Sequence, residues 1–183
     1  LFITGAFSML EALLGVGMMG TPMARRLCAA GYRVHVWNRS PAKAEALQAH
    51  GATAFSQPAD AVRDAHLVIT MLQDGPAVES VLFKQGAATG LQPGTLVVDM
   101  SSIQPREARD HAARLAALSV DCLDAPVSGG TVGAEAGTLA IMAGGRLADF
   151  ERARPVLQVL GRPTHVGPMG RGQWAKLATQ RTV

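Results

Sequence analysis

The sequence predicts an α/β protein with a doubly wound, mostly parallel sheet, and three observations support this fold class. Short apolar segments alternate with helical segments, which is the pattern of parallel strands joined by helices on both faces of a sheet. Aromatic residues make up only 4% of the chain while glycine reaches 20 residues, a balance that suits helices packed tightly on a sheet. The 183 residues, 48% of them hydrophobic, are enough for one sizeable core.

Strands are predicted where short apolar runs stand between turn residues. In chain order they are Glu11–Leu14, Arg33–Trp37, His66–Leu72, Thr95–Met100, Val120–Asp124, Thr138–Ala143 and a last short strand at His165-Val166.

Helices are predicted from the spacing of apolar residues and from their ends, because proline is tolerated in the first turn and glycine is common just past the last one. In chain order they are Pro22–Ala30, Pro41–His50, Pro76–Phe83, Gln104–Leu118, Ala148–Leu160 and a helix from Gln173 onward. Pro155 predicts a kink or restart within its helix, and the glycine-rich stretch Ser128–Gly137 is predicted to be a loop.

The first strand is followed by a glycine motif, Gly15-Val16-Gly17-Met18-Met19-Gly20. Gly15 permits a tight turn, Gly17 lets the backbone approach a pyrophosphate, and Gly20 lets helix and strand pack closely. The start of the next helix offers free N–H groups and the positive end of its dipole to the phosphates. The motif alone is weak, but its place between a strand and a helix predicts a Rossmann-type dinucleotide-binding domain.

The end of the second strand indicates which dinucleotide binds. NAD-binding domains carry an acidic residue there that holds the ribose 2′-hydroxyl, whereas this chain has Asn38-Arg39-Ser40. No carboxylate repels a 2′-phosphate, and Arg39 can pair with it. We therefore expect NADP as the cofactor, with NAD as the alternative. Met71 and Leu72, at the C-terminal end of a strand, are expected to line the cofactor cleft.

Four segments resemble the β-hydroxyacid dehydrogenases, a family that includes 3-hydroxyisobutyrate dehydrogenase, tartronate semialdehyde reductase, glyoxylate/succinic semialdehyde reductases and, more distantly, 6-phosphogluconate dehydrogenase. The segments are Gly15–Leu27 (GVGMMGTPMARRL), Val98–Ile103 (VDMSSI), Asp124–Gly130 (DAPVSGG) with its continuation through Gly133–Gly145, and Gly170–Gln180 (GRGQWAKLATQ). They stand in the family's order and span about residues 11–180. The resemblance implies the N-terminal, cofactor-binding domain of such an enzyme.

The resemblance also implies roles for individual residues. Lys176 is the implied catalytic acid/base, and Ser102 stands beside the nicotinamide. The implied substrate-binding residues are Ser128, Gly129, Gly130, Thr179 and Gln180. A free lysine titrates at about 10.4, so burial or cationic neighbours must lower the pKa of Lys176 for proton transfer near neutrality.

The chain departs from the family pattern at two places. Arg26 stands where the family often has Asn, and Thr179 stands where it generally has Asn. Thr179 keeps a hydroxyl but loses the paired donor and acceptor of an amide, so the resemblance implies less efficient catalysis.

The function implied by the resemblance is an NAD(P)-dependent oxidoreductase that interconverts a small 3-hydroxyacid and its semialdehyde or oxo form. Two alternatives stay open: a non-catalytic NADP-binding fragment or pseudoenzyme, and 6-phosphogluconate dehydrogenase itself. Imine reductases share the architecture but generally lack a lysine at the position of Lys176, so they rank last.

The expected domain organisation is residues 1–10 as leader or fragment sequence, 11–167 as the NADP-binding domain and 168–183 as the start of an interdomain helix. In the family this helix leads into an all-α domain that closes the substrate cleft and forms the dimer, and we expect this chain to lack it. Cofactor affinity would then survive better than turnover, because an open cleft stays wet. The longer protein is expected to be a homo-oligomer.

Charge and cysteine content argue against other classes of protein. The net charge is +3 with scattered basic residues, which does not favour nucleic-acid binding. No apolar run approaches membrane-spanning length. Cys28 and Cys122 stand in no metal-ligand spacing, so we expect buried thiols and no metal site. A cytoplasmic protein with a small carboxylate substrate is the expectation.

Overall fold

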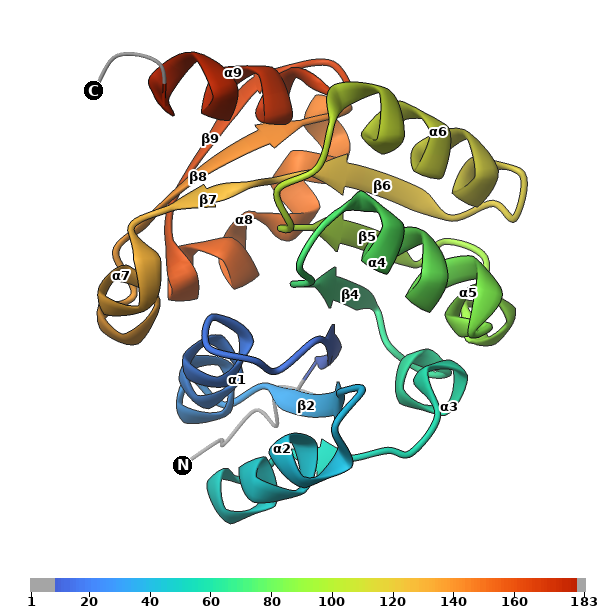
Figure 1. Cartoon of the computed structure of the whole chain (residues 1–183), viewed down its shortest axis with the longest axis vertical. Helices are drawn as coiled ribbons and strands as arrows, with labels where there is room; N and C mark the ends of the chain where they lie inside the picture. The colour runs from blue at the N-terminus through green and yellow to red at the C-terminus, as the bar shows by residue number, and fades with distance from the viewer. Residues whose placement is uncertain (1–8, 181–183) are drawn as a thin grey trace, which may run out of the picture.

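A computed structural model describes residues 9–180 and confirms the predicted fold class. The strands of this region form one sheet in the order β3-β2-β1-β4-β5-β6-β8-β7, with β9 paired to β8 (Figure 1). They are β1 (Leu10–Leu14), β2 (Arg33–Trp37), β3 (Thr53–Ala54), β4 (Leu67–Thr70), β5 (Leu96–Asp99), β6 (Asp121–Asp124), β7 (Val127–Ser128), β8 (Leu139–Gly144) and β9 (Gly161–Gly167). The pairings from β3 to β6 are parallel, whereas β8 runs antiparallel to β6 and β7.

The helices connect these strands on both faces of the sheet. They are α1 (Gly20–Ala29), α2 (Pro41–Glu45), which continues as the 3-10 helix η1 (Ala46–His50), α3 (Pro58–Val62), α4 (Gly75–Glu79), which continues as the π-helical turn η2 (Ser80–Lys84), α5 (Ala87–Gly90), α6 (Pro105–Ala116), α7 (Gly130–Ala136), α8 (Leu147–Leu160) and α9 (Arg171–Gln180). None of the helices in the described part of the chain has the length and apolar character of a membrane span.

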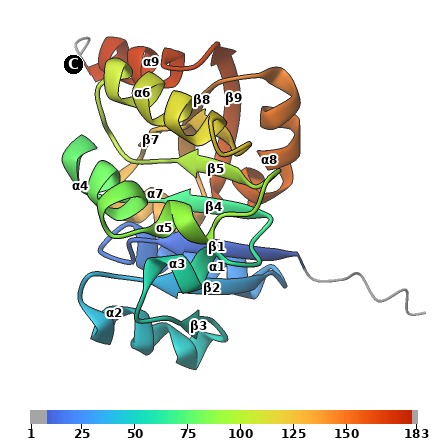
Figure 2. The same cartoon turned by 90° about the vertical axis from the view of Figure 1, so that its right-hand side faces the viewer.

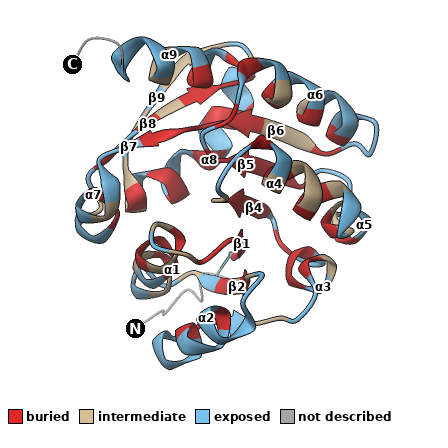
Figure 3. Ribbon diagram, in the orientation of Figure 1, coloured by how far each residue is buried: buried red, intermediate tan, exposed pale blue. Residues whose placement is uncertain are grey.

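The core lies in two layers, one on each face of the sheet, because the central strands are apolar on both sides. Leu13 of β1 packs in the cluster formed with α1 and α8, while its neighbours Ala12 and Leu14 pack in the cluster formed with α3, α4 and α6. Figure 2 shows the sheet between these sets of helices, and Figure 3 shows that its central strands are buried. Continuous burial of this kind is typical of parallel sheets covered on both faces.

The strand order places a cleft at the carboxyl ends of the central strands β1 and β4. From β1 the chain moves to β2 and β3 on one side, and then returns to β4 on the other side of β1. The connections after β1 and β4 therefore diverge at the carboxyl ends of adjacent strands, which is where open α/β sheets bind ligands.

Several predicted elements differ from the structure. The stretch Ser128–Gly137 is not a loop: β7 ends at Ser128, and α7 follows because Gly129 and Gly130 take φ angles of +135° and +60° that turn the chain into a helix. Helix α8 does not restart at Pro155 but continues through it from Leu147 to Leu160. The last strand is longer than predicted, and α9 begins at Arg171 rather than Gln173.

Two further differences concern short elements and the N-terminus. The short elements β3, α3 and α5 had no predicted counterpart. Strand β1 begins at Leu10, one residue earlier than predicted, and residues 1–8 of the expected leader lie outside the described residues, as do 181–183.

The amino-terminal end of β1 holds a buried acid. Glu11 is 1% exposed, and its Oε2 atom has no hydrogen-bond partner in the described region. Burial raises the pKa of Glu11 to about 8, and a hydrogen bond with the Leu67 backbone opposes this only in part. A carboxyl group in such surroundings keeps its proton at neutral pH.

Candidate active site

The turn after β1 brings three backbone segments into close contact. Gly15 has a φ angle of +100°, and a Cβ atom there would collide with the carbonyl oxygen of Met71 after β4. A Cβ atom at Gly20 would collide with the carbonyl oxygen of Gly15. Side chains are therefore excluded at both positions by packing between β1, α1 and the end of β4.

Gly17 differs from these two glycines because it faces open space. A Cβ atom built on it would meet nothing within 4 Å. Helix α1 begins just beyond it, without a side-chain cap or an acidic residue in its first turn. In the described structure the N–H groups of Gly17, Met18 and Met19 have no acceptor. Free N–H groups at the positive end of a helix dipole form a site for an anion.

The end of β2 shapes one wall of the same region. The Oδ1 atom of Asn38 accepts a hydrogen bond from the N–H of Val16 at 3.0 Å, and its Nδ2 atom donates to the carbonyl oxygen of Ser40 at 3.2 Å. Asn38 thus joins the glycine turn to the turn after β2. Arg39 and Ser40 are exposed on the rim.

These segments border a cleft of about 290 Å³. The glycine turn and Asn38-Arg39-Ser40 form one side, and Met71 and Leu72 with residues of α4 and η2 form the other. The rim also carries Lys43 of α2. No ion pair within residues 9–180 engages Arg39 or Lys43, so both cations are available to an anion.

Lys176 of α9 lies beside the segment that follows β5 and the first residue of β7. Its Nζ atom donates hydrogen bonds to the Ser102 hydroxyl at 2.5 Å and to the Val127 carbonyl oxygen at 2.8 Å. Burial lowers the pKa of Lys176, because removal from water disfavours the ammonium form. The structure therefore brings together Lys176, Ser102 and the residue that precedes Ser128.

Helix α9 is anchored to the sheet by Asp124 at the end of β6. The two carboxylate oxygens of Asp124 accept hydrogen bonds from the N–H groups of Gly170, at 2.7 Å, and Gln173, at 2.9 Å. Burial raises the pKa of Asp124, while the backbone hydrogen bonds act in the opposite direction. A Cβ atom at Gly172 would collide with the Asp124 carbonyl oxygen, so glycine is required for this close approach.

A further buried acid, Asp99, connects the ends of β4 and β5. Its Oδ1 atom accepts hydrogen bonds from the Thr70 hydroxyl at 2.9 Å and from the Ser101 N–H at 3.0 Å. The Ser101 hydroxyl in turn accepts from the N–H of Leu72 at 2.9 Å. Burial raises the pKa of Asp99 to about 6 despite these hydrogen bonds. The network fixes Leu72 on the cleft wall relative to the segment that carries Ser102.

The other predicted substrate-binding residues lie near Lys176 but differ in their contacts. Ser128, Gly129 and Gly130 are exposed and form the entrance to α7. The Thr179 hydroxyl donates to the Lys176 carbonyl oxygen at 2.8 Å, so it is engaged within its own helix. Gln180 is exposed at the end of α9.

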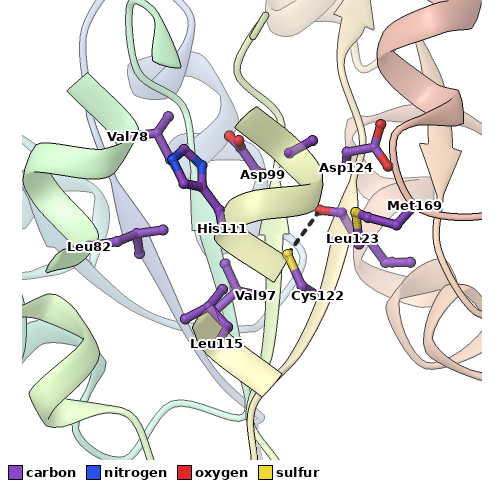
Figure 4. Close-up of a pocket in the computed structure, with 11 residues that line it drawn as sticks. Val78, Leu82, Val97, Asp99, His111, Leu115, Cys122, Leu123, Asp124 and Met169 are labelled. Carbon is purple, nitrogen blue, oxygen red and sulfur yellow. Dashed lines mark hydrogen bonds between the residues drawn. The ribbon is translucent and has the colours of Figure 1, made fainter. Parts of the chain in front are cut away.

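A small void near Asp99 and Asp124 is separate from the cofactor cleft and adds no binding space to it. The void measures about 10 Å³ and is lined by Asp99, His111, Cys122 and Asp124 together with apolar side chains (Figure 4). A space of this size corresponds to a single water-sized sphere. It belongs to the packing under α6 and is far too small for a dinucleotide.

Comparison with known protein families agrees with this architecture. The family model of the NAD binding domain of 6-phosphogluconate dehydrogenase matches residues 11–170. The chain therefore belongs to this family of nicotinamide-cofactor-binding domains, and the predicted resemblance to the N-terminal domain of β-hydroxyacid dehydrogenases is confirmed.

Particular relatives are similar over nearly the whole chain. It is 43% identical over 169 residues to the 2-hydroxy-3-oxopropionate reductase of Escherichia coli (strain K12), a match that covers 91% of this chain and 58% of the reductase. It is 43% identical over 168 residues to the 3-hydroxyisobutyrate dehydrogenase of Pseudomonas aeruginosa, covering 91% of this chain and 56% of that enzyme. The structure of Mycobacterium tuberculosis 3-hydroxyisobutyrate dehydrogenase with L-serine superimposes with a TM-score of 0.90 at 37% identity, covering 96% and 60% of the two chains. The chain thus spans less than two thirds of the length of these relatives.

Three residues of the site were missed in the sequence. Lys43 faces the cleft from one turn into α2, a position that the proline-led helix pattern could have indicated. Asp124 was read only as part of a substrate-binding segment, whereas it anchors α9. Gln173 had no signal beyond its place in the lysine helix, and its side chain is 2% exposed against the Ser102 segment.

Proposed function

We propose that the protein is an NADP(H)-preferring oxidoreductase that interconverts a small 3-hydroxyacid and its semialdehyde or oxo form. The observation that carries this proposal is the contact of a partly buried lysine, Lys176, with the hydroxyl of Ser102 in the segment after β5. Similarity to enzymes named for 2-hydroxy-3-oxopropionate and 3-hydroxyisobutyrate supports the substrate class.

The cofactor site fits a dinucleotide. The free N–H groups of Gly17, Met18 and Met19 would hold the pyrophosphate, and Gly17 leaves room for it because it has no side chain. Met71 and Leu72 offer an apolar wall to the ring system. When bound, the nicotinamide supplies or accepts the hydride of the reaction.

The preference for NADP(H) follows from charge at the rim of the cleft. Arg39 and Lys43 are exposed, and neither is engaged in an ion pair within the described residues. Arg39 can bind a 2′-phosphate through two N–H groups, Lys43 adds a second charge, and Ser40 adds a hydroxyl. The turn contains no carboxylate that would repel this phosphate.

Lys176 is the proposed acid/base. In the reductive direction its ammonium group donates a proton to the carbonyl oxygen as the alcohol forms, and in the oxidative direction the neutral amine accepts the hydroxyl proton. The lowered pKa of Lys176 makes the neutral amine more accessible than in a solvated lysine. The Ser102 hydroxyl accepts a hydrogen bond from Nζ and so restricts where the amine points.

The substrate carboxylate is proposed to bind at Ser128, Gly129 and Gly130. Ser128, Gly129 and Gly130 are exposed residues at the entrance to α7, directly after the Val127 carbonyl that contacts Lys176, and they would offer a hydroxyl and two backbone N–H groups to the carboxylate. Thr179 and Gln180 follow Lys176 at the end of α9 and are proposed to bound the substrate on its other side.

The proposal is tested by cofactor turnover with a panel of small 3-hydroxyacids and NADP⁺, and of semialdehydes and NADPH. Activity is expected for at least one pair, and Lys176→Met is expected to lower kcat by about 10²–10⁴-fold while cofactor binding is retained. Lys84→Met serves as the matched control because Lys84 is exposed on η2. Cofactor binding without turnover for any pair would favour the non-catalytic alternative.

A further inference from the structure

Gln173 lies one helical turn before Lys176, so the two side chains share a face of α9. The Gln173 side chain is 2% exposed. Its Oε1 atom accepts a hydrogen bond from the N–H of Ile103 at 3.2 Å, and its Nε2 atom donates to the carbonyl oxygen of Ser101 at 2.9 Å. These two bonds flank Ser102, the residue whose hydroxyl contacts the lysine amine.

We propose that Gln173 is a positioning residue that clamps the Ser101-Ser102-Ile103 segment to α9 and thereby holds Ser102 against Lys176. This inference rests on the proposed role of Lys176 in catalysis. The clamp joins elements that are far apart in the sequence, because Ser102 follows β5 while Gln173 and Lys176 belong to α9.

The backbone of Gln173 is itself held in place. The N–H of Gln173 donates to the Asp124 carboxylate at 2.9 Å, so the residue is bound through its backbone to the end of β6 and through its side chain to the segment after β5. Movement of Ser102 away from the lysine would break at least one of the two side-chain bonds. The position of the amine relative to Ser102 is therefore set by three hydrogen bonds of a single residue.

An amide suits this position because it offers a hydrogen-bond donor and an acceptor at the same time, whatever the pH. The clamp needs an acceptor toward Ile103 and a donor toward Ser101 at the same time, and glutamine supplies both. A glutamate carboxylate would accept from Ile103 but place negative oxygen against the Ser101 carbonyl. A protonated glutamic acid supplies a donor and an acceptor again, so Gln173→Glu is a variant whose clamp depends on pH.

The effect on the lysine can be measured directly because the chain contains three lysines, Lys43, Lys84 and Lys176. Protein labelled with ¹³C and ¹⁵N lysine gives three ε-methylene signals, and Lys176→Met assigns the one of interest. In the wild-type protein Lys176 is expected to titrate below the ordinary lysine value. In Gln173→Leu the midpoint is expected to move up to that ordinary value, because the freed segment admits water to the amine. Gln158→Glu, an exposed glutamine on α8, is the control and leaves the Lys176 midpoint unchanged.

The activity readout separates positioning from folding. Gln173→Leu is expected to lower kcat by about 10²-fold with little change in the KM for the cofactor. The ratio of Gln173→Glu to wild-type kcat is expected to fall as pH rises through the titration of the new carboxyl group, because deprotonation removes the donor toward Ser101. Gln173→Leu has no such group, so its kcat is expected to depart from the wild-type pH profile only where Lys176 itself titrates.

The two proposals fail in different ways. If no substrate is turned over, the proposed function fails while the Lys176 titration still decides the clamp. If Gln173→Leu does not fold, the titration of Lys176 in Gln173→Met gives the decision, because methionine keeps the length of the side chain without its donor and acceptor and adds no charge beside the amine. An unchanged Lys176 midpoint in a folded Gln173 variant would overturn the clamp.

Discussion

Replacing the buried Glu11 by glutamine should remove a destabilising effect that grows with pH. The folded protein holds this carboxyl in apolar surroundings, where burial raises its pKa from the ordinary 4.5 to about 8. Between these two values the unfolded chain releases the proton while the folded chain retains it. Because the folded state then binds more protons, stability falls as pH rises through this window and levels off above pH 8.

The magnitude follows from the gap between the two pKa values. At about 1.4 kcal/mol per pH unit, the full gap corresponds to about 5 kcal/mol, of which about 4 kcal/mol develops between pH 5 and pH 8. This is a large share of the stability of an ordinary domain, which is about 5–15 kcal/mol. Glu11→Gln has no ionisable group at this position and keeps nearly the same shape, so its free energy of unfolding should not fall with pH through this group.

Urea unfolding followed by tryptophan fluorescence measures the effect, since Trp37 is buried beside β1 in the folded protein. The free energy of unfolding of Glu11→Gln minus that of the wild-type protein should rise by about 1.4 kcal/mol per pH unit from pH 5 to pH 8. Glu45→Gln, an exposed glutamate on α2, is the control and should show no such slope. A Glu11→Gln difference that is constant with pH would refute the reasoning, whatever its absolute size.

Two further predictions concern the glycine turn and the anchor of α9. Gly17→Val should fold like the wild-type protein, because a Cβ atom at Gly17 meets nothing within 4 Å, but it should lose dinucleotide binding. Gly20→Ala should instead lower the melting temperature, because a Cβ atom at Gly20 collides with the Gly15 carbonyl oxygen. Calorimetry and a cofactor titration on both variants check this pair, and equal cofactor binding by Gly17→Val and the wild-type protein would count against the phosphate site. Asp124→Leu should cost about 2–6 kcal/mol in urea unfolding, because it leaves two buried N–H groups without an acceptor; a loss below about 1 kcal/mol would show that the anchor is weak.

Much of the fold and part of the site could be predicted from the sequence because these features are local. The Gly15–Gly20 motif depends on backbone conformation within a few residues, and the buried strands can be recognised as short apolar runs. The glycine-rich stretch before Leu139 was misread for the opposite reason. Glycines there predict a loop, yet α7 forms because it packs against α1 and because Arg26 donates to the Glu135 carbonyl oxygen.

Contacts between distant segments explain what the sequence could not provide. Arg26, where the family often has Asn, bonds the Val159 carbonyl oxygen at 2.9 Å, a partner 133 residues away. The roles of Asp124 and Gln173 likewise depend on α9 folding back over the ends of β5 and β6. No sequence pattern marks either residue. A single acid or amide at the end of a strand or in a helix is most often solvated or hydrogen-bonded to the nearby backbone.

A titration of the purified protein with NADPH and with NADH, followed by nicotinamide fluorescence, tests the central claim most directly. The account predicts that NADPH binds at least about tenfold more tightly than NADH, and that Arg39→Ala removes most of this difference by taking away a charged partner of the 2′-phosphate. Equal affinity for the two cofactors would contradict the NADP(H) preference, and the absence of binding by either would contradict the assignment of the cleft itself.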